Sequence, residues 1–181
     1  FIIGWTYLND QRYLQFQQAL TYLQQALDGA KDKNRSDLLK WAARAALDAG
    51  QYGQALQWYK KLEEIQTLTV DRGNLATTYN QIGLIYDKKG DWDKALVFHR
   101  KSEAIRLELG DKTGLAATYN GIGGIYYQKG DLDKALIFYE KSEAIRLEMG
   151  NKVGLARIYN NIGLIYDNKG DWDKALVFYE K

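Results

Sequence analysis

The sequence of 181 residues has no cysteine and no proline, and it has a single histidine and a single methionine. Without cysteine there is no disulfide framework, no thiol nucleophile and no thiolate ligand for a metal. Without proline the strongest helix breaker is missing, so glycine, aspartate and asparagine must end the helices. The apolar runs are too short for a segment that spans a bilayer.

An excess of charge of either sign is also missing. The formal net charge is +2, and basic and acidic residues are interspersed along the whole chain. We therefore expect neither nucleic acid nor a membrane surface as a partner. The chain begins at Phe1 and shows no charged-then-apolar leader. We expect it to be part of a longer protein, and we expect a cytoplasmic location.

The dominant feature is an internal repeat of 40 residues. One copy begins at Asp71 and another at Asp111, and these two agree at about two thirds of their positions. A further copy begins at Asn151 and stops at Lys181, and weaker copies precede Asp71. The chain is therefore expected to be a single array, 1–181, with repeats at about 1–32, 33–70, 71–110, 111–150 and 151–181, the last one incomplete.

Each repeat has the pattern of two helices. Apolar and aromatic residues at Tyr79, Ile82 and Tyr86 follow a helical spacing of three and four. Gly90 can adopt the left-handed conformation that ends the first helix, and Asp91 can cap the second. The same joint recurs at Gly130-Asp131 and Gly170-Asp171, and between repeats at Gly110-Asp111 and Gly150-Asn151. No strand pattern competes, so the sequence predicts an all-α fold in which stacked helix pairs bury each other's apolar faces.

Three copies share a further pattern of large, small and aromatic residues. Its members are Tyr79, Ile82-Gly83, Tyr86, Ala95, His99 and Ser102; then Tyr119, Ile122-Gly123, Tyr126, Ala135, Tyr139 and Ser142; then Tyr159, Ile162-Gly163, Tyr166, Ala175 and Tyr179. This pattern resembles the tetratricopeptide repeat. The common unit is shorter and usually ends in proline. The longer unit, with an asparagine ahead of the Ile-Gly pair, resembles the kinesin light chain and Pins subgroup and repeats of bacterial signalling proteins.

The resemblance implies a right-handed superhelical solenoid of antiparallel helix pairs. It also implies a non-enzymatic scaffold without a cofactor, which binds a protein or peptide in a concave groove lined by the first helices. The groove positions carried across are Thr77, Asn80, Leu84, Asp87, Lys88, Ala117, Asn120, Gly124, Tyr127, Gln128, Arg157, Asn160, Leu164, Asp167 and Asn168.

Asn80, Asn120 and Asn160 are the most specific candidates, because asparagine is a mediocre helix former and yet recurs at one position. The resemblance implies that such a ladder bonds the main chain of a ligand, since a carboxamide offers both donor and acceptor. Two alternatives stay open, a bond to the adjacent helix and mere duplication. Gly123 is explained by close helix packing, and Gly124 is expected to leave a dent in the groove unless it reflects drift.

Other candidates have structural explanations. His99 takes the place of Tyr139 and Tyr179 in later copies, so we expect it between repeats and not in a catalytic site. The paired aspartates such as Asp91 and Asp93 lack the further ligands of a calcium loop, and helix capping explains them. Trp92 and Trp172 are expected to cover the joint between helices. Glu103 with Arg106, and Glu143 with Arg146, are spaced as helical ion pairs on a solvated face. No catalytic residue and no metal site is predicted.

An alternative function is a structural spacer or a self-assembling segment of a larger protein, such as a bacterial signalling protein. Lys181 falls inside the last predicted helix, so no capping helix follows it in this sequence. An apolar face is then left open, and end-to-end self-association through the uncapped terminal repeats is the expected consequence.

Overall fold

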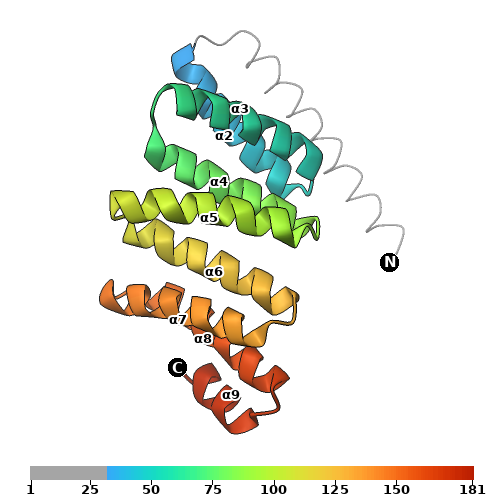
Figure 1. The fold of residues 1–181 in the computed structure, drawn as a ribbon, viewed down its shortest axis with the longest axis vertical. Coiled ribbons are helices and arrows are strands. Elements are labelled where there is room, and N and C mark those ends of the chain that lie inside the picture. Colours follow the sequence, from blue (N-terminus) through green and yellow to red (C-terminus); the bar gives the residue numbers. More distant parts are fainter. Residues whose placement is uncertain (1–31) are drawn as a thin grey trace, which may run out of the picture. The chain divides into compact units, whose positions relative to one another are not determined.

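Glycine and aspartate divide the chain into helices at the expected places. The structure, a computed structural model, describes residues 32–181, and the expected repeat at 1–32 therefore lies outside the described residues but for its last one. This part of the chain has eight helices and no strand, and Figure 1 labels these helices along the ribbon. They are α2 (Asp32–Asp48), α3 (Tyr52–Leu68), α4 (Arg72–Lys88), α5 (Trp92–Leu109), α6 (Lys112–Gln128), α7 (Leu132–Glu148), α8 (Lys152–Asn168) and α9 (Trp172–Tyr179). The predicted all-α fold is confirmed.

The helix ends follow the predicted chemistry. Gly90, Gly130 and Gly170 have φ values of 74°, 77° and 76°, which is the left-handed region. The side chains of Asp71, Asp91, Asp111, Asp131, Asn151 and Asp171 each accept a hydrogen bond from the backbone N–H three residues later. Helix α3 differs, because Gln51 precedes it and makes no side-chain cap bond.

Contacts divide the chain into two compact blocks, block 1 (1–70) and block 2 (71–181), which are described separately. The described part of block 1 is the helix pair α2 and α3, which pack on one another. Leu39, Ala43, Trp58 and Leu62 are buried in this pair. The described part of block 1 therefore has the two-helix form of a repeat, although its sequence differs from the later copies.

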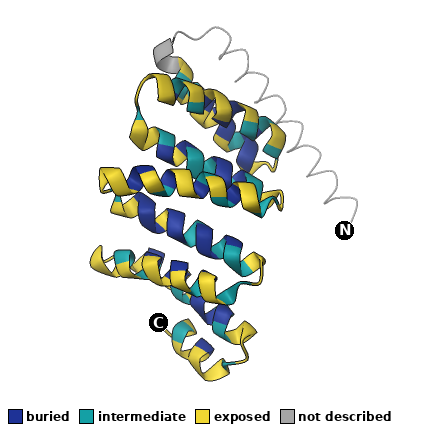
Figure 2. Ribbon diagram, viewed as in Figure 1, coloured by how far each residue is buried: buried dark blue, intermediate teal, exposed yellow. Residues whose placement is uncertain are grey.

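Block 2 is a stack of helices in chain order. Each helix from α4 to α9 packs on its neighbours in the sequence, and α4 also contacts α6 directly. Ile82, Ile122 and Ile162 are fully buried on the first helices of three successive repeats. Buried positions gather where helices meet and exposed positions lie on the other side of each helix (Figure 2). Each repeat of block 2 thus buries its apolar side against the next.

Aromatic rings join the two helices of each repeat in block 2. Phe98 stacks on Tyr86 at a ring-centroid distance of 5.5 Å and lies tilted against Tyr79 at 6.0 Å. The same triad recurs at Tyr119, Tyr126 and Phe138, and at Tyr159, Tyr166 and Phe178. Such ring pairs contribute about 0.5–1.5 kcal/mol beyond their buried area. The repetition of one packing unit positions the first helices of successive repeats in the same way.

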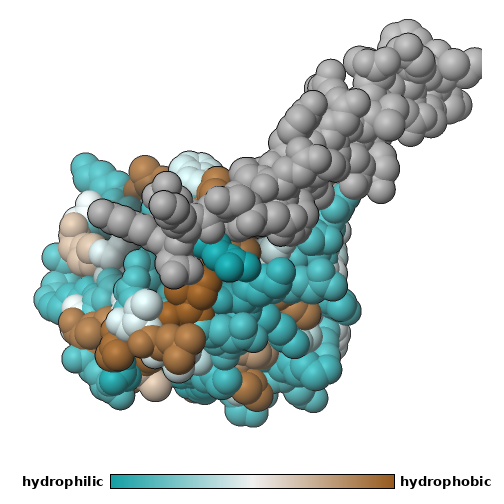
Figure 3. Space-filling view, turned by 90° about the horizontal axis from the view of Figure 1, so that it is seen from above, coloured by the Kyte–Doolittle hydropathy of each residue, from teal (hydrophilic) through white to brown (hydrophobic). Residues whose placement is uncertain are grey.

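The described surface is mostly polar. Figure 3 shows one face of it, on which hydrophobic side chains form separate patches among hydrophilic ones. None of the helices within residues 32–181 combines the length and the apolar character that crossing a membrane requires.

Candidate functional site

The fifteen predicted groove positions lie on the first helices α4, α6 and α8, five on each. Their spacing along each helix places them on one side, since residues three and four apart share a helix face. We call these fifteen residues the first-helix face. Leu84, Gly124 and Leu164 are half-buried on it, whereas Thr77, Ala117 and Arg157 are exposed near the beginnings of their helices.

Two pairs on the first-helix face bond across neighbouring helices. Gln128 Nε2 donates to Asp87 Oδ1 at 2.9 Å, and Asn168 Nδ2 donates to Tyr127 Oη at 2.8 Å. Burial raises the pKa of Asp87 above its ordinary value, although the Gln128 hydrogen bond acts in the opposite direction. These bonds link α4 to α6 and α6 to α8, so the ends of the three helices form one connected polar surface.

The three asparagines have different surroundings. Asn80 Oδ1 lies 2.8 Å from His99 Nδ1, and Asn120 Oδ1 accepts from Asn161 Nδ2 at 3.0 Å. Asn160 is exposed and makes no hydrogen bond to any described residue. Within residues 32–181 no hydrogen bond joins the three, and none uses Nδ2 of Asn80 or Asn120. The carboxamide N–H groups of all three therefore make no hydrogen bond within the described chain, while two of the three oxygens bond to protein.

His99 is the internal partner of Asn80. It is 3% exposed and lies between α4 and α6, which confirms the predicted position between repeats. A Cβ atom added at Gly83 or at Gly121 would stand 2.9 Å from an atom of the imidazole ring, so both glycines make room for it. Burial lowers the pKa of His99 to about 4. The ring is therefore neutral near pH 7 and donates from Nδ1 to Asn80.

The neighbouring glycines 123 and 124 differ in what surrounds them. A Cβ at Gly123 would stand 2.8 Å from the ring of Tyr139, which confirms the explanation by close helix packing. A Cβ at Gly124 would meet only Tyr139 Oη, at 3.7 Å, which is an ordinary contact. Packing alone does not require a glycine at position 124, where the repeats on either side have leucine. Its missing side chain leaves space on the first-helix face.

The predicted pair of Glu103 with Arg106 is wrong. Arg106 is only 7% exposed, and its Nη1 forms an ion pair with Asp111 Oδ2 beyond the end of the helix. Its other nitrogens donate to Ser102 Oγ at 3.0 Å and to Thr77 Oγ1 at 3.3 Å. Glu103 pairs with Arg100 instead, at 2.6 Å. Arg106 is buried because Gly114 has no side chain and leaves its guanidinium room against α6.

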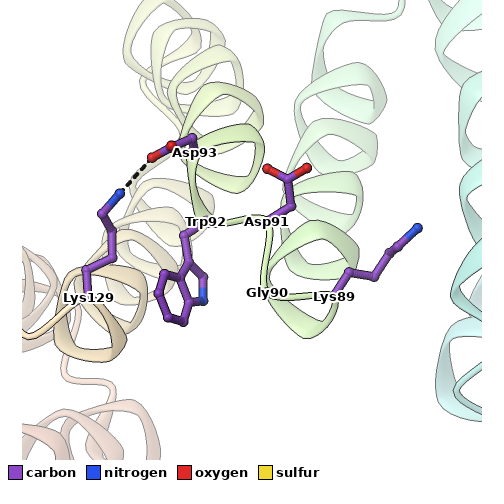
Figure 4. Close-up of a pocket in the computed structure, with 6 residues that line it drawn as sticks. All are labelled: Lys89, Gly90, Asp91, Trp92, Asp93 and Lys129. Carbon is purple, nitrogen blue, oxygen red and sulfur yellow. Dashed lines mark hydrogen bonds and ion pairs between the residues drawn. The ribbon is translucent and has the colours of Figure 1, made fainter.

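A shallow pocket at the joint of α4 and α5 is a second candidate surface. Its lining residues are Lys89, Gly90, Asp91, Trp92, Asp93 and Lys129, and its volume is about 320 Å³ (Figure 4). Lys129 Nζ and Asp93 Oδ1 pair across it at 2.6 Å, and the same pair recurs as Lys169 with Asp133 at 2.5 Å. The buried Nε1 of Trp92 has no hydrogen-bond partner within the described chain. The pocket's charges are largely matched internally, and the recurrence of its ion pair one repeat later indicates a joint between repeats.

The aspartates of this joint have the capping and pairing roles described above. In the part of the chain that the structure describes, no group of three or more histidine, aspartate or glutamate side chains is arranged to hold a metal ion. Asn161, the partner of Asn120, is not among the residues predicted from the sequence. Its position is Gln81 and Gly121 in the earlier repeats, so the recurring pattern did not include it.

Helix pairs that repeat every 40 residues and pack on one another in chain order define an α-helical repeat array. The chain belongs to the tetratricopeptide repeat family, whose sequence model matches residues 34–108 and 114–181. No curated protein matches the chain.

Solved structures with the same fold include three informative neighbours. BtubC (BKLC) from P. vanneervenii is 21% identical with a TM-score of 0.80, over 94% of this chain and 72% of that one. A kinesin light chain from P. anserina with nearly identical TPR-like repeats is 18% identical with a TM-score of 0.72, over 94% and 86%. The Rap conjugation gene regulator of the plasmid pLS20, in complex with the Phr* peptide, is 15% identical with a TM-score of 0.77, over 94% and 49%. At these identities the likeness shows the fold alone.

Proposed function

We propose that the chain is a non-catalytic scaffold whose first-helix face binds an extended segment of a partner protein. The observation that carries the proposal is the recurrence of Asn80, Asn120 and Asn160, each with carboxamide N–H groups free of bonds to described residues. Amide donors at a regular interval suit the carbonyl groups of an extended main chain, whatever its sequence. The Rap regulator, which has this fold, was solved with a peptide.

The internal partners of two asparagines favour an orientation in which the amide nitrogen, and not the oxygen, faces a ligand. His99 and Asn161 each bond an asparagine oxygen, which leaves the amide nitrogen as the free end. In both contacts the structure places the carboxamide oxygen toward the internal partner. Donor groups held in place before binding lose less conformational entropy when a ligand arrives.

The rest of the first-helix face indicates a polar ligand of mixed charge. Asp87, Lys88 and Asp167 lie at the ends of α4 and α8, and Arg157 lies near the start of α8. Leu84 and Leu164 are half-buried on either side of Gly124, where the missing side chain leaves a space for one ligand side chain.

Peptide titrations test the proposal. Labelled chain 1–181 is screened on an array of random dodecapeptides, and the strongest binder is titrated against Asn80→Ala, Asn120→Ala and Asn160→Ala by fluorescence anisotropy. We expect each variant to weaken binding about two- to tenfold, equivalent to about 0.5–1.5 kcal/mol. Glu140→Ala, at an exposed position on α7, is the control and should bind as the original chain does.

Asn160→Ala is the most direct of the three variants, because Asn160 has no bond to a described residue that the change would break. Unchanged affinity in all three variants would refute the asparagine ladder. A complete absence of bound peptides would refute the peptide-binding function itself.

Self-association is a second candidate function, favoured by exposed apolar residues on α9. Tyr179 is 46% exposed, whereas Tyr139 at the same position one repeat earlier is 4% exposed. Leu176 is 57% exposed, although its equivalents on α5 and α7 are half-buried. Sedimentation velocity across a range of concentrations should then show association that Leu176→Lys abolishes. Val177→Lys is the matched control, because this position is exposed in all three repeats. A single monomeric species at every concentration would exclude this candidate.

A further inference from the structure

Arg146 on α7 occupies the same position as Arg106 on α5 but lacks its carboxylate. Asn151 stands where the preceding repeat has Asp111. Arg146 Nε donates to Ser142 Oγ at 3.2 Å, just as Arg106 donates to Ser102. Its Nη atoms have no hydrogen bond or ion pair with any residue among 32–181. Arg146 is therefore a half-buried guanidinium without a counter-charge in the described chain.

The cap of α8 explains why Asn151 cannot replace the aspartate. Asp111 uses both oxygens, since Oδ1 accepts from Gly114 N at 2.9 Å and Oδ2 pairs with Arg106. Asn151 Oδ1 makes the same cap bond, from Gly154 N at 2.8 Å. Its second atom is then Nδ2, which is a donor and makes no hydrogen bond within the described chain. An amide donor thus stands in the position from which Asp111 neutralises Arg106.

The other partner of Arg106 is also replaced. Arg106 Nη2 donates to Thr77 Oγ1, whereas the corresponding residue of the next repeat is Ala117, which has no hydroxyl. The guanidinium of Arg146 still lies at the same place, because a Cβ added at Gly154 would be 1.9 Å from its Nη1. The later copy of this arrangement has the arginine and the glycine but lacks two acceptors.

Arg157 on the first-helix face adds a second positive charge. Burial, and then the charge of Arg157, lower the pKa of Arg146. Arg157 is exposed and forms no ion pair within residues 32–181. Unpaired charge that has lost part of its hydration is unfavourable, and an incoming anion relieves it.

We propose that Arg146 and Arg157, with the Asn151 amide, bind a carboxylate of the peptide on the first-helix face. This inference rests on the proposed function. The carboxylate belongs either to an aspartate or glutamate side chain or to a peptide C-terminus, and it takes the place that Asp111 Oδ2 has beside Arg106. Guanidinium groups suit this ligand because they match a carboxylate with two parallel donors.

The substitution Asn151→Asp tests the site without removing either arginine. It supplies an internal carboxylate of the kind that Arg106 already has, so it closes the site to a ligand. The cap of α8 is retained, as the aspartate at 111 shows. The reverse change, Asp111→Asn, opens a similar site at Arg106.

The probe is an array of random dodecapeptides in matched pairs, which differ only by Glu or Asp against Gln or Asn, each with a free or an amidated C-terminus. Labelled chain 1–181 should bind the carboxylate member of a pair about tenfold more tightly. Asn151→Asp and Arg157→Ala should each remove this preference, and Asp111→Asn should keep it. Loss of the preference on amidation assigns the site to a C-terminus, and loss on the Glu-to-Gln change assigns it to a side chain.

Circular dichroism and urea unfolding establish that the variants are folded, and Asn151→Asp is expected to be at least as stable as the original chain. Equal binding of both members of each pair, or an unchanged preference in Asn151→Asp, would overturn the carboxylate site and leave the peptide-binding function standing. No binding to any spot would overturn both.

Discussion

At the scale of single residues, Val70 stands out because its backbone is left-handed. Its φ is 56°, and it ends its repeat where Gly110 and Gly150 end theirs with φ values of 66° and 63°. A β-branched residue is strained in this conformation, by about 1–2 kcal/mol.

Val70→Gly should therefore stabilise the fold by about 1 kcal/mol, measured as a higher urea midpoint. Val153→Gly is the control, because Val153 is an exposed residue inside α8. There the same change should destabilise the fold by about 0.5–1 kcal/mol, through lost helix propensity. Equal effects of the two substitutions would contradict the strain at Val70.

His99 should make the stability of the fold depend on pH. Its pKa is about 4 in the folded protein and about 6.5 when unfolded, so the unfolded chain binds a proton more readily. The stabilisation is present above pH 6.5 and is lost as the pH falls toward 4, by roughly 2 kcal/mol between pH 7 and pH 4.5. Urea unfolding at both pH values measures it.

His99→Tyr is the matched variant, since Tyr139 and Tyr179 occupy this position in the later repeats. Carboxylates contribute the same pH dependence to both proteins, so the difference between them isolates the histidine. Identical pH slopes would refute a buried neutral His99.

Side-chain partners were the part that the sequence predicted least well. The interior position of His99 followed from the tyrosines that replace it, but its bond to Asn80 depends on how α4 and α5 are set against one another. The spacing of Glu103 and Arg106 suggested an ion pair along one helix. That spacing contains no information on the space beside Gly114. The guanidinium of Arg106 occupies this space and pairs with Asp111.

At the scale of helices, prediction from sequence succeeded because helix ends are decided locally. A left-handed glycine followed by an aspartate needs only its own neighbours to end one helix and begin the next. Gly90-Asp91 and Gly130-Asp131 both behave in this way. The same reasoning explains the exception, since Gln51 before α3 is a poor capping residue and makes no cap bond.

Gln51→Asp should accordingly stabilise block 1 by about 1 kcal/mol, because it adds the cap that the later second helices have. Trp58 is buried on α3, and its fluorescence provides a local probe during urea unfolding once the other four tryptophans are replaced by phenylalanine in both proteins. Asp131→Ala is the complementary change and should cost about 0.5–2 kcal/mol by removing the bond to Lys134 N. If the Gln51→Asp protein is no more stable than the original, the backbone N–H groups at the beginning of α3 already have other hydrogen-bond partners.

At the scale of the whole molecule, a repeated sequence predicts a repeated packing unit but not the bonds between units. Asp87 bonds Gln128, and Tyr127 bonds Asn168, each pair being 41 residues apart in a sequence whose period is 40. A residue on one first helix therefore bonds, in the following repeat, the residue one place beyond its own equivalent. The alignment of repeats cannot show this offset, because it depends on how far each helix pair turns relative to the one before.

Block 2 contains enough of these units to be stable without block 1. Its buried residues form clusters of their own, one around Leu115, Tyr119 and Ile122 and another around Tyr139 and Ile162. In a repeat array stability comes from each repeat and its contacts with the nearest neighbours, and two complete repeats with a partial third supply both. Residues 71–181 alone should therefore show a helical circular dichroism spectrum and a cooperative urea transition, with an m-value reduced in proportion to the surface removed.

The same fragment with Gly123→Ala, which places a Cβ 2.8 Å from the Tyr139 ring, should unfold at a lower urea concentration, because its free energy of unfolding falls by about 1–3 kcal/mol. A fragment that is helical but melts without a cooperative transition would mean that neighbour contacts within block 2 are too weak to hold the first-helix face in place.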